Sequence, residues 1–242
     1  MVVMGTRPQI IKTAPLVWAM NELGLDYRLV LTKQHYDYEL CDVFFRDLQL
    51  PKPDYILSVP AESVSHATQT HSIMVGVEEA VSKIEPSLLV VRGDTNTTLA
   101  SALAGLKHTV PIAHVEAGVR SFDFRMAEEH NRRLTDQVSS LLFAATGWNR
   151  RNLEAEKVSG EVFVTGNTVM DAVKHYFTCQ HNDALDCDLP EEFILATVHR
   201  AENVDDPSRL RDIVEMLTNL PLPLPVKHPS RNCSFSAYCG SR

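Results

Sequence analysis

The sequence lacks the features that define several protein classes. Its five cysteines are an odd number, and no two form a Cys-x-x-Cys pair, which argues against a disulfide framework or a zinc site. No run reaches the ~18 apolar residues of a membrane span. No basic segment precedes the short apolar start "MVVMG", as a signal peptide would require. We therefore expect a cytoplasmic protein with reduced thiols.

Basic residues are also scarce in this chain of 242 residues. It has 23 Lys and Arg against 31 Asp and Glu, a formal net charge of -8. Because nucleic-acid backbones demand a basic face, we expect no nucleic-acid partner. A local basic pocket for one small phosphate ligand is still compatible with this charge.

What the sequence does contain is a repeated alternation of short β-rich runs and helical stretches. The runs "LLVV" (88–91) and "VFVT" (162–165) have no polar alternation, which predicts strands buried on both faces. A helix is expected from about residue 64 to residue 84. The pattern predicts an α/β fold, with a Rossmann-like parallel sheet covered by helices.

The alternation also suggests where the chain divides. We expect a Rossmann-like N-terminal domain over residues 1–168, a connecting helix and linker over 169–190, and a partial second domain over 191–242. That last part has one βα unit, "FILATVHRAENVDDPSRLRDIVEMLTNL", and then a tail without βα rhythm. Because an independent sheet needs about three strands, the unit either packs on the first domain or belongs to an incomplete second one.

Polar and charged residues follow nearly every predicted strand. Parallel sheets bind ligands at the carboxyl ends of their strands, so these residues form a candidate site. In strand order they are Gly5, Thr6, Arg7 and Lys12; Lys33, Gln34 and His35; Arg92, Gly93, Asp94 and Thr95; Glu116, Gly118 and Arg120; Gly166, Asn167 and Thr168; and His199, Arg200, Glu202 and Asn203.

Each strand-end residue also has an ordinary structural explanation. Asp94 could cap the helix that follows it. Glu116 could pair with Arg120, four residues on, and His199 could be a core histidine. Several carboxylates and cations at one edge of one sheet are difficult to explain as unrelated caps. The joint pattern favours acid–base groups that face a cationic grip for a phosphate-bearing leaving group.

The segment "FRMAEEHNRRLTDQ" adds charge on a predicted helix. It contains two acid–base pairs spaced by four residues, Glu128 with Arg132 and Glu129 with Arg133, and Asp136 follows Arg132 by four. One explanation is an exposed helix laced with weak ion pairs. The alternative is that Glu128, near the N-terminal end, points to the same site as Asp94 and Glu116.

Six ordered motifs resemble the non-hydrolysing UDP-N-acetylglucosamine 2-epimerase family. They are "GTRPQIIKTAPL", "RGDTNTT", "HVEAGVRS", "EEHNRRLTD", "VTGNTVMDA" and "VHRAEN", and the resemblance runs to about Leu220. It implies a glycosyltransferase-B type fold, two Rossmann-like halves with a cleft between them. It further implies no cofactor and no metal, a homodimer, and interconversion of UDP-N-acetylglucosamine and UDP-N-acetylmannosamine.

The resemblance also implies a mechanism and a set of site residues. UDP leaves C-1 while a base takes the C-2 proton, which gives a 2-acetamidoglucal; UDP then adds back with protonation from the other face. The implied catalytic residues are Asp94, Glu116, Glu128 and His199, the last near the diphosphate. The implied substrate-binding residues are Arg7, Lys12, Arg132 and Asn167. Gln34 and His35 match a region that binds a second, activating substrate molecule in some bacterial members.

The sequence departs from the family pattern at several places. Gln9 stands where the family usually has glutamate, and Ala127 where proline is common. Nothing after Leu220 resembles the segment that holds the uridine nucleotide in the family. We therefore expect a C-terminally truncated chain with impaired activity. The alternatives are a non-catalytic remnant, a hydrolysing epimerase that releases N-acetylmannosamine and UDP, and a sugar-transferring relative, which the three carboxylates disfavour.

Overall fold

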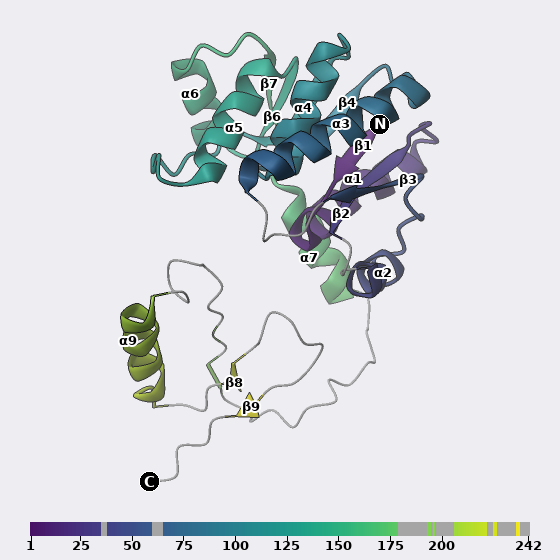
Figure 1. Ribbon diagram of the computed structural model, residues 1–242. Coiled ribbons are helices and arrows are strands. Elements are labelled where there is room, and N and C mark those ends of the chain that lie inside the picture. The colour runs from purple at the N-terminus through teal and green to yellow at the C-terminus, as the bar shows by residue number, and fades with distance from the viewer. Residues whose placement is uncertain are drawn as a thin grey trace. The chain divides into compact units, whose positions relative to one another are not determined.

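The computed structural model describes most of the N-terminal three quarters of the chain and short pieces of the rest (Figure 1). The described residues are 1–34, 38–59, 65–178, 193–194, 196, 206–221, 225–226 and 236–237. The chain divides into two compact units, Met1–Cys179 and Gln180–Arg242, and each is described by itself.

The first unit is built on a seven-stranded parallel sheet with the order β3-β2-β1-β4-β5-β6-β7. The strands are β1 (Val2–Met4), β2 (Leu29–Gln34), β3 (Tyr55–Val59), β4 (Leu89–Arg92), β5 (Ile112–Ala117), β6 (Leu141–Ala144) and β7 (Glu161–Val164). The direction of winding reverses between β1 and β4, which is where such sheets bind ligands. The predicted Rossmann-like parallel sheet is confirmed.

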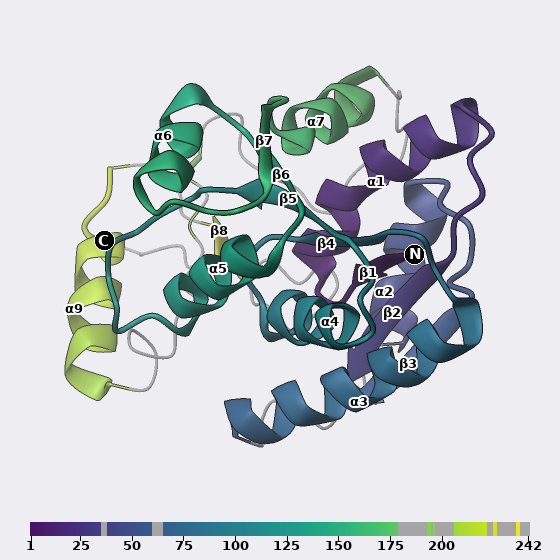
Figure 2. The same cartoon turned by 90° about the horizontal axis from the view of Figure 1, so that it is seen from above.

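Helices cover both faces of this sheet (Figure 2). They are α1 (Arg7–Glu22), α2 (Tyr38–Asp47), α3 (His66–Ile84), α4 (Asn96–Lys107), α5 (Ala127–Val138), α6 (Gly147–Ala155) and α7 (Thr168–Thr178). One buried cluster packs α3 and α4 on the sheet, and a second packs α1 and α2 on the opposite face. Figure 2 shows α3, α4 and α5 on one side and α1 and α7 on the other.

The structure corrects three expectations about the strands. The strands expected from the sequence include neither β3 nor β6; α5 ends at Val138, Ser139 is extended, and β6 follows almost at once. Burial on both faces is right for β4 and wrong for β7. Since β7 lies at the edge of the sheet, Phe163 and Val164 remain partly exposed despite the apolar pattern.

The second unit contributes one described helix and one short strand pair. Helix α9 (Pro207–Thr218) lies within the predicted βα unit, and Asp206 caps it by accepting hydrogen bonds from the backbone N–H groups of Ser208 and Arg209. The strand predicted before α9 falls largely outside the described residues. Strands β8 (Pro225–Val226) and β9 (Ser236–Ala237) pair in antiparallel fashion. Among the described helices, none has the length and apolar character needed to cross a membrane.

Candidate active site

The carboxyl ends of β4 and β5 turn sharply at the centre of the sheet. Gly93 and Gly118 have positive φ angles of 74° and 76°, and Glu116 has a φ of 72°. A positive φ is rare for a residue other than glycine, and it concentrates at functional sites. The pairing of β5 with β6 also shifts register between Val115 and Ala117. This irregularity sets the direction of the Glu116 side chain.

Glu116 is held by two cations from different elements. Lys12 Nζ of α1 lies 3.2 Å from Glu116 Oε1, and Arg92 Nη2 at the end of β4 lies 3.3 Å from Oε2. The Arg92 side chain is only 3% exposed. Burial lowers the pKa of Arg92 to about 10, although the Glu116 charge opposes that shift. Arg92 Nη2 also donates a 3.4 Å hydrogen bond to Asn167 Oδ1 at the start of α7.

Asp94, at the end of the neighbouring strand, is held by one cation. Arg132 Nη2 of α5 lies 2.5 Å from Asp94 Oδ2, and Asn131 Nδ2 donates to the Asp94 backbone oxygen at 3.0 Å. Thr95, not Asp94, is the N-cap of α4, because its hydroxyl accepts from the backbone N–H of Thr98. The carboxylate of Asp94 is therefore free of the capping role that was its alternative explanation.

Gln9 ties the loop after β1 to the loop after β4. Its Oε1 accepts hydrogen bonds from the backbone N–H groups of Gly5 and Thr6 at 2.9 and 3.1 Å. Its Nε2 donates to the Arg92 carbonyl at 2.7 Å and to the Thr98 hydroxyl at 3.0 Å. A glutamate here would lack the donor that reaches the Arg92 carbonyl. The departure at Gln9 thus has a structural use in this chain.

The two acids at the start of α5 lie in opposite environments. Glu129 is fully buried, and its Oε2 accepts from the Ser121 backbone and hydroxyl and pairs with Arg132 at 3.2 Å. Burial acts to raise the Glu129 pKa, but these hydrogen bonds and the Arg132 charge outweigh it and lower the pKa. Glu128 is exposed and has no hydrogen-bond or ion-pair partner among the described residues.

Glu128 nevertheless shares a helix face with residues that reach Asp94. It lies three residues before Asn131 and four before Arg132, and such spacings bring side chains together on one side of a helix. Both of those residues contact Asp94. Glu128 therefore lies on the side of α5 that faces Asp94.

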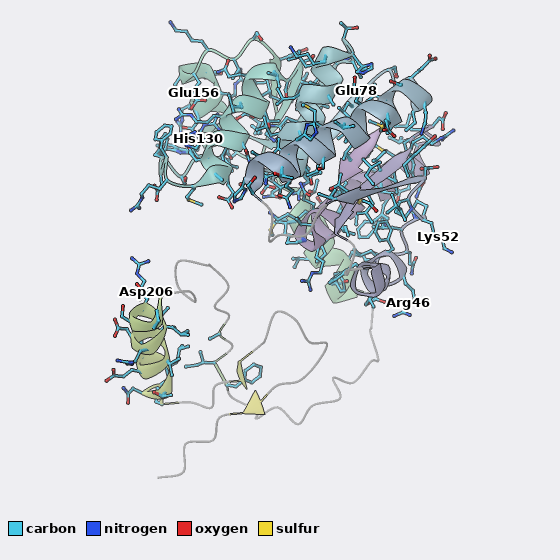
Figure 3. The ribbon with its side chains drawn as sticks, viewed as in Figure 1. Arg46, Lys52, Glu78, His130, Glu156 and Asp206 are labelled. Atoms are coloured by element: carbon cyan, nitrogen blue, oxygen red, sulfur yellow. The ribbon has the colours of Figure 1, made fainter. Side chains whose placement is uncertain are left out.

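The remaining charges of α5 do not pair as the spacing suggests. Arg120 pairs with Asp136 and Glu156, each at 2.7 Å, so the expected alternative of a Glu116–Arg120 pair is wrong. Arg133 pairs with Glu156 at the end of α6 and not with Glu129. Figure 3 marks Glu156 and, on α5, His130.

The exposed-helix explanation of α5 is also wrong. Arg132 and Asp136 are buried, and Arg132 bonds to Asp94 and Glu129, not to Glu128. Only part of the helix surface meets solvent. The charged face of α5 is therefore part of the wall behind the strand ends.

Of the other predicted site residues, the structure describes the side chain of Arg7 but not those of Gln34, His35 and His199. Arg7 is half-buried at the first position of α1 and makes no hydrogen bond or ion pair with a described residue. Gln34 ends β2, but its side chain lies outside the described part of the structure. His35 and His199 also lie outside the described residues. Within the described ranges, no three His, Cys, Asp or Glu side chains are grouped as a metal site would require.

Sequence reasoning missed the buried polar residues behind this edge. Arg92 was noted only as a strand-end residue, and His114 was not singled out. His114 is fully buried inside β5, and its ring contacts Asp136 of α5. A polar residue within an otherwise apolar strand, as in "PIAHV", was the available signal.

Comparison with known proteins identifies the relatives of this chain. A family profile described as UDP-N-acetylglucosamine 2-epimerase matches residues 19–228. The chain belongs to the UDP-N-acetylglucosamine 2-epimerase family. It is 41% identical over 221 residues to the UDP-N-acetylglucosamine 2-epimerase of Methanocaldococcus jannaschii, with 88% of this chain and 60% of the relative covered.

Two further comparisons extend the family relationship. The chain is 41% identical to the UDP-2,3-diacetamido-2,3-dideoxy-D-glucuronate 2-epimerase of Pseudomonas aeruginosa, with 94% of this chain and 66% of the relative covered. It resembles the crystal structure of the M. jannaschii epimerase in complex with UDP-GlcNAc and UDP, with a TM-score of 0.86 and 38% identity, over 94% of this chain and 65% of that one. The chain thus spans 60 to 66% of the length of these epimerase-family relatives.

Proposed function

We propose that the first unit carries the acid–base half of an enzyme that inverts C-2 of a UDP-2-acetamido sugar, through elimination and re-addition of UDP. The observation that carries this proposal is the placement of Asp94 and Glu116 at adjacent strand ends, each against its own cations. Two separately supported carboxylates suit a reaction that needs proton transfer on two faces of one carbon.

The proposed reaction balances in two steps. In the first, a carboxylate takes the C-2 proton, the C-1 to oxygen bond breaks, and UDP leaves with the bonding electron pair to give a 2-acetamidoglucal. In the second, a UDP oxygen adds to C-1 and a carboxylic acid returns a proton to C-2 from the opposite face. Asp94 and Glu116 are the proposed proton carriers, with Glu128 as the third carboxylate from the family resemblance.

The leaving diphosphate needs positive charge. Arg7, which has no partner among the described residues, and Lys12 both lie on the first two turns of α1, whose N-terminal end faces the same strand ends. Arginine and lysine bind phosphate groups through charge-assisted hydrogen bonds. We propose that Arg7 and Lys12 stabilise the departing diphosphate; for His199 this role rests on the family resemblance alone.

The substrate proposal stays at the level of the sugar class. Of the two curated relatives described above, one is named for UDP-N-acetylglucosamine and the other for a UDP-diacetamido-glucuronate. Both names describe a UDP sugar with a 2-acetamido group and inversion at C-2. UDP-N-acetylglucosamine and UDP-N-acetylmannosamine are the proposed substrates to test first.

We further propose that these 242 residues alone turn over slowly. The relatives are longer, and a nucleotide sugar held by part of a site loses much of the orientation that catalysis requires. Joining the chain to the remaining segment of the M. jannaschii relative is expected to raise the rate. Equal rates with and without that segment would contradict this part of the proposal.

The direct experiment incubates the chain, alone and joined to that segment, with UDP-N-acetylglucosamine in D2O. The expected products are UDP-N-acetylmannosamine and substrate with deuterium at C-2. Release of free N-acetylmannosamine and UDP would indicate the hydrolysing outcome instead. If neither form showed exchange at C-2 or a new product, the proposed function would be wrong for this chain.

A further inference from the structure

A buried histidine–aspartate pair lies directly behind the two candidate carboxylates. His114 of β5 and Asp136 of α5 both have fully buried side chains. His114 Nδ1 lies 2.6 Å from Asp136 Oδ1, and His114 Nε2 lies 2.8 Å from the backbone oxygen of Gly93. Neither residue has a part in the reaction proposed above.

Both ring nitrogens of His114 therefore face acceptors. A backbone carbonyl can only accept, so Nε2 must carry a proton. The second oxygen of Asp136, Oδ2, accepts from the Gly118 N–H at 3.2 Å and from Arg120 at 2.7 Å. Because both neighbours are donors, Oδ2 carries no proton. Burial acts to raise the pKa of Asp136, but the His114 and Arg120 contacts outweigh it and lower that pKa. The 2.6 Å contact between His114 Nδ1 and Asp136 Oδ1 places one proton between the ring and the carboxylate.

The pair also joins the two loops that carry the carboxylates. Gly93, which accepts from His114, directly precedes Asp94. Gly118, which donates to Asp136, follows Glu116 by two residues. Asp136 lies one helical turn after Arg132, the residue that holds Asp94. One buried pair thus contacts both strand-end loops and the helix that pins one of them.

We propose that His114, through the hydrogen bond from its Nε2–H to the Gly93 carbonyl, is a positioning residue that fixes the Gly93–Asp94 turn relative to Glu116. This inference rests on the proposed function of the two carboxylates. His114 acts through the Gly93 carbonyl and does not touch the substrate. Because catalytic geometry tolerates little displacement, loss of this one hydrogen bond is expected to slow the reaction more than it weakens nucleotide binding.

Charged groups surround the pair of His114 and Asp136. Asp136 is the direct partner of His114, and Arg120, bonded to the same carboxylate, pairs in turn with Glu156. On the side of β4, Asp94 follows the Gly93 carbonyl. Arg133 also pairs with Glu156, so Arg120 and Arg133 balance the negative charges of Asp136 and Glu156.

The first test observes the ring itself and needs no activity. Nitrogen-15 NMR of histidine-labelled chain, with His114→Asn to assign the signals, shows whether Nε2 of His114 carries a proton. We expect a proton on Nε2, because that nitrogen faces the Gly93 carbonyl. A signal from a bare Nε2 of His114 would overturn the inference.

The second test separates the two hydrogen bonds of the ring. The amide nitrogen of asparagine lies where Nδ1 lies and can keep the Asp136 bond, whereas that of glutamine reaches the place of Nε2 and can keep the Gly93 bond. His114→Asn is expected to lower kcat by about 100-fold with a smaller change in KM, and His114→Gln by about tenfold or less. His108→Asn, at the end of α4, is the matched control.

A third readout applies to the chain whether or not it turns over substrate. The Gly93 N–H donates to the Val115 carbonyl, so its hydrogen exchange reports on the turn. We expect faster exchange at Gly93 in His114→Asn than in His114→Gln. Equal exchange in both variants, or a kcat ranking that simply follows their melting temperatures, would overturn the positioning role. An inactive parent chain with these NMR and exchange results would contradict only the proposed function.

Discussion

The ends of β4 and β5 each place a carboxylate at the same edge of the sheet but surround it differently. Asp94 is 36% exposed and meets one cation, Arg132. Glu116 is 18% exposed and meets two, Lys12 and Arg92. Two carboxylates in one site with unequal surroundings can take unequal parts in acid–base chemistry. The difference suggests two roles for the two groups and not one shared role.

The supports of the two carboxylates also come from different parts of the chain. Asp94 depends on α5, whereas Glu116 depends on α1 and β4. The pair of His114 and Asp136 contacts both loops. The surroundings of Asp94 and Glu116 can therefore be changed separately, or together through the pair of His114 and Asp136.

Removing either carboxylate is expected to have the largest effect. Asp94→Asn and Glu116→Gln keep the side-chain size but remove the proton carrier, so each should lower the epimerisation rate by about 10²- to 10⁴-fold. The measurement is a coupled assay on the chain joined to the relative's remaining segment. Glu154→Gln, in an exposed pair with Arg150, is the control and should leave the rate unchanged. Normal turnover in either site variant would remove that residue from the mechanism.

Removing Asp136, which contacts His114 and the loop after β5, should lower the free energy of unfolding the most. Asp136→Ala leaves the buried His114 and Arg120 without their carboxylate, and such losses typically cost about 3–5 kcal/mol. Denaturant unfolding of the variant measures this directly. Asp26→Ala, which removes an exposed partner of Arg28, should change the free energy by less than about 1 kcal/mol. Similar losses in the two variants would show that the buried pair contributes no more than a surface contact.

Acid should weaken the Asp94 side of the site through α5. The pKa values of Asp136, Glu129 and Glu156 are lowered in the folded chain from ordinary values of 3.8 and 4.5. Lowered carboxyl pKa values stabilise the fold above the ordinary values, and this stabilisation is lost as the pH falls through the lowered ones. Thermal melting at a series of pH values should therefore show a fall in Tm beginning near pH 4.5. A Tm that is constant down to about pH 3 would contradict these shifts.

The smallest stability effect is expected at Arg92. Burial of the Arg92 charge carries a desolvation cost, and Glu116 keeps Lys12 as a partner, so Arg92→Met should change the free energy of unfolding by about 1 kcal/mol or less. The variant leaves Glu116 with a single cation, as Asp94 has, and the epimerisation rate should fall about tenfold. Arg46→Met on α2 is an exposed control. A large loss of stability would show that Arg92 has a structural role.

The fold could be predicted from apolar runs because long buried strands and amphipathic helices leave a periodic pattern. The prediction failed at β6, whose four apolar residues follow α5 too closely to be separated from it. It failed for burial at β7 because the sequence does not reveal which strand lies at the edge. Only the topology decides that.

Site residues could be predicted where they follow a strand that the sequence reveals. Asp94 and Glu116 are predicted by the rule that parallel sheets bind ligands at the carboxyl ends of their strands. The partners could not be derived, because spacing along α5 suggests pairs within the helix, whereas Arg132 and Asp136 reach across to other elements. Long-range contacts of this kind depend on how α5 packs on the sheet.

The most direct test of two unequal carboxylates follows deuterium at C-2 in single variants. UDP-N-acetylglucosamine and UDP-N-acetylmannosamine are each incubated in D2O with the Asp94→Asn and Glu116→Gln forms of the chain joined to the relative's remaining segment. If each group serves one face, one variant should still exchange the C-2 hydrogen of one sugar without forming the other, and the second variant should show the reverse preference. Equal loss of exchange from both sugars in both variants would contradict the account.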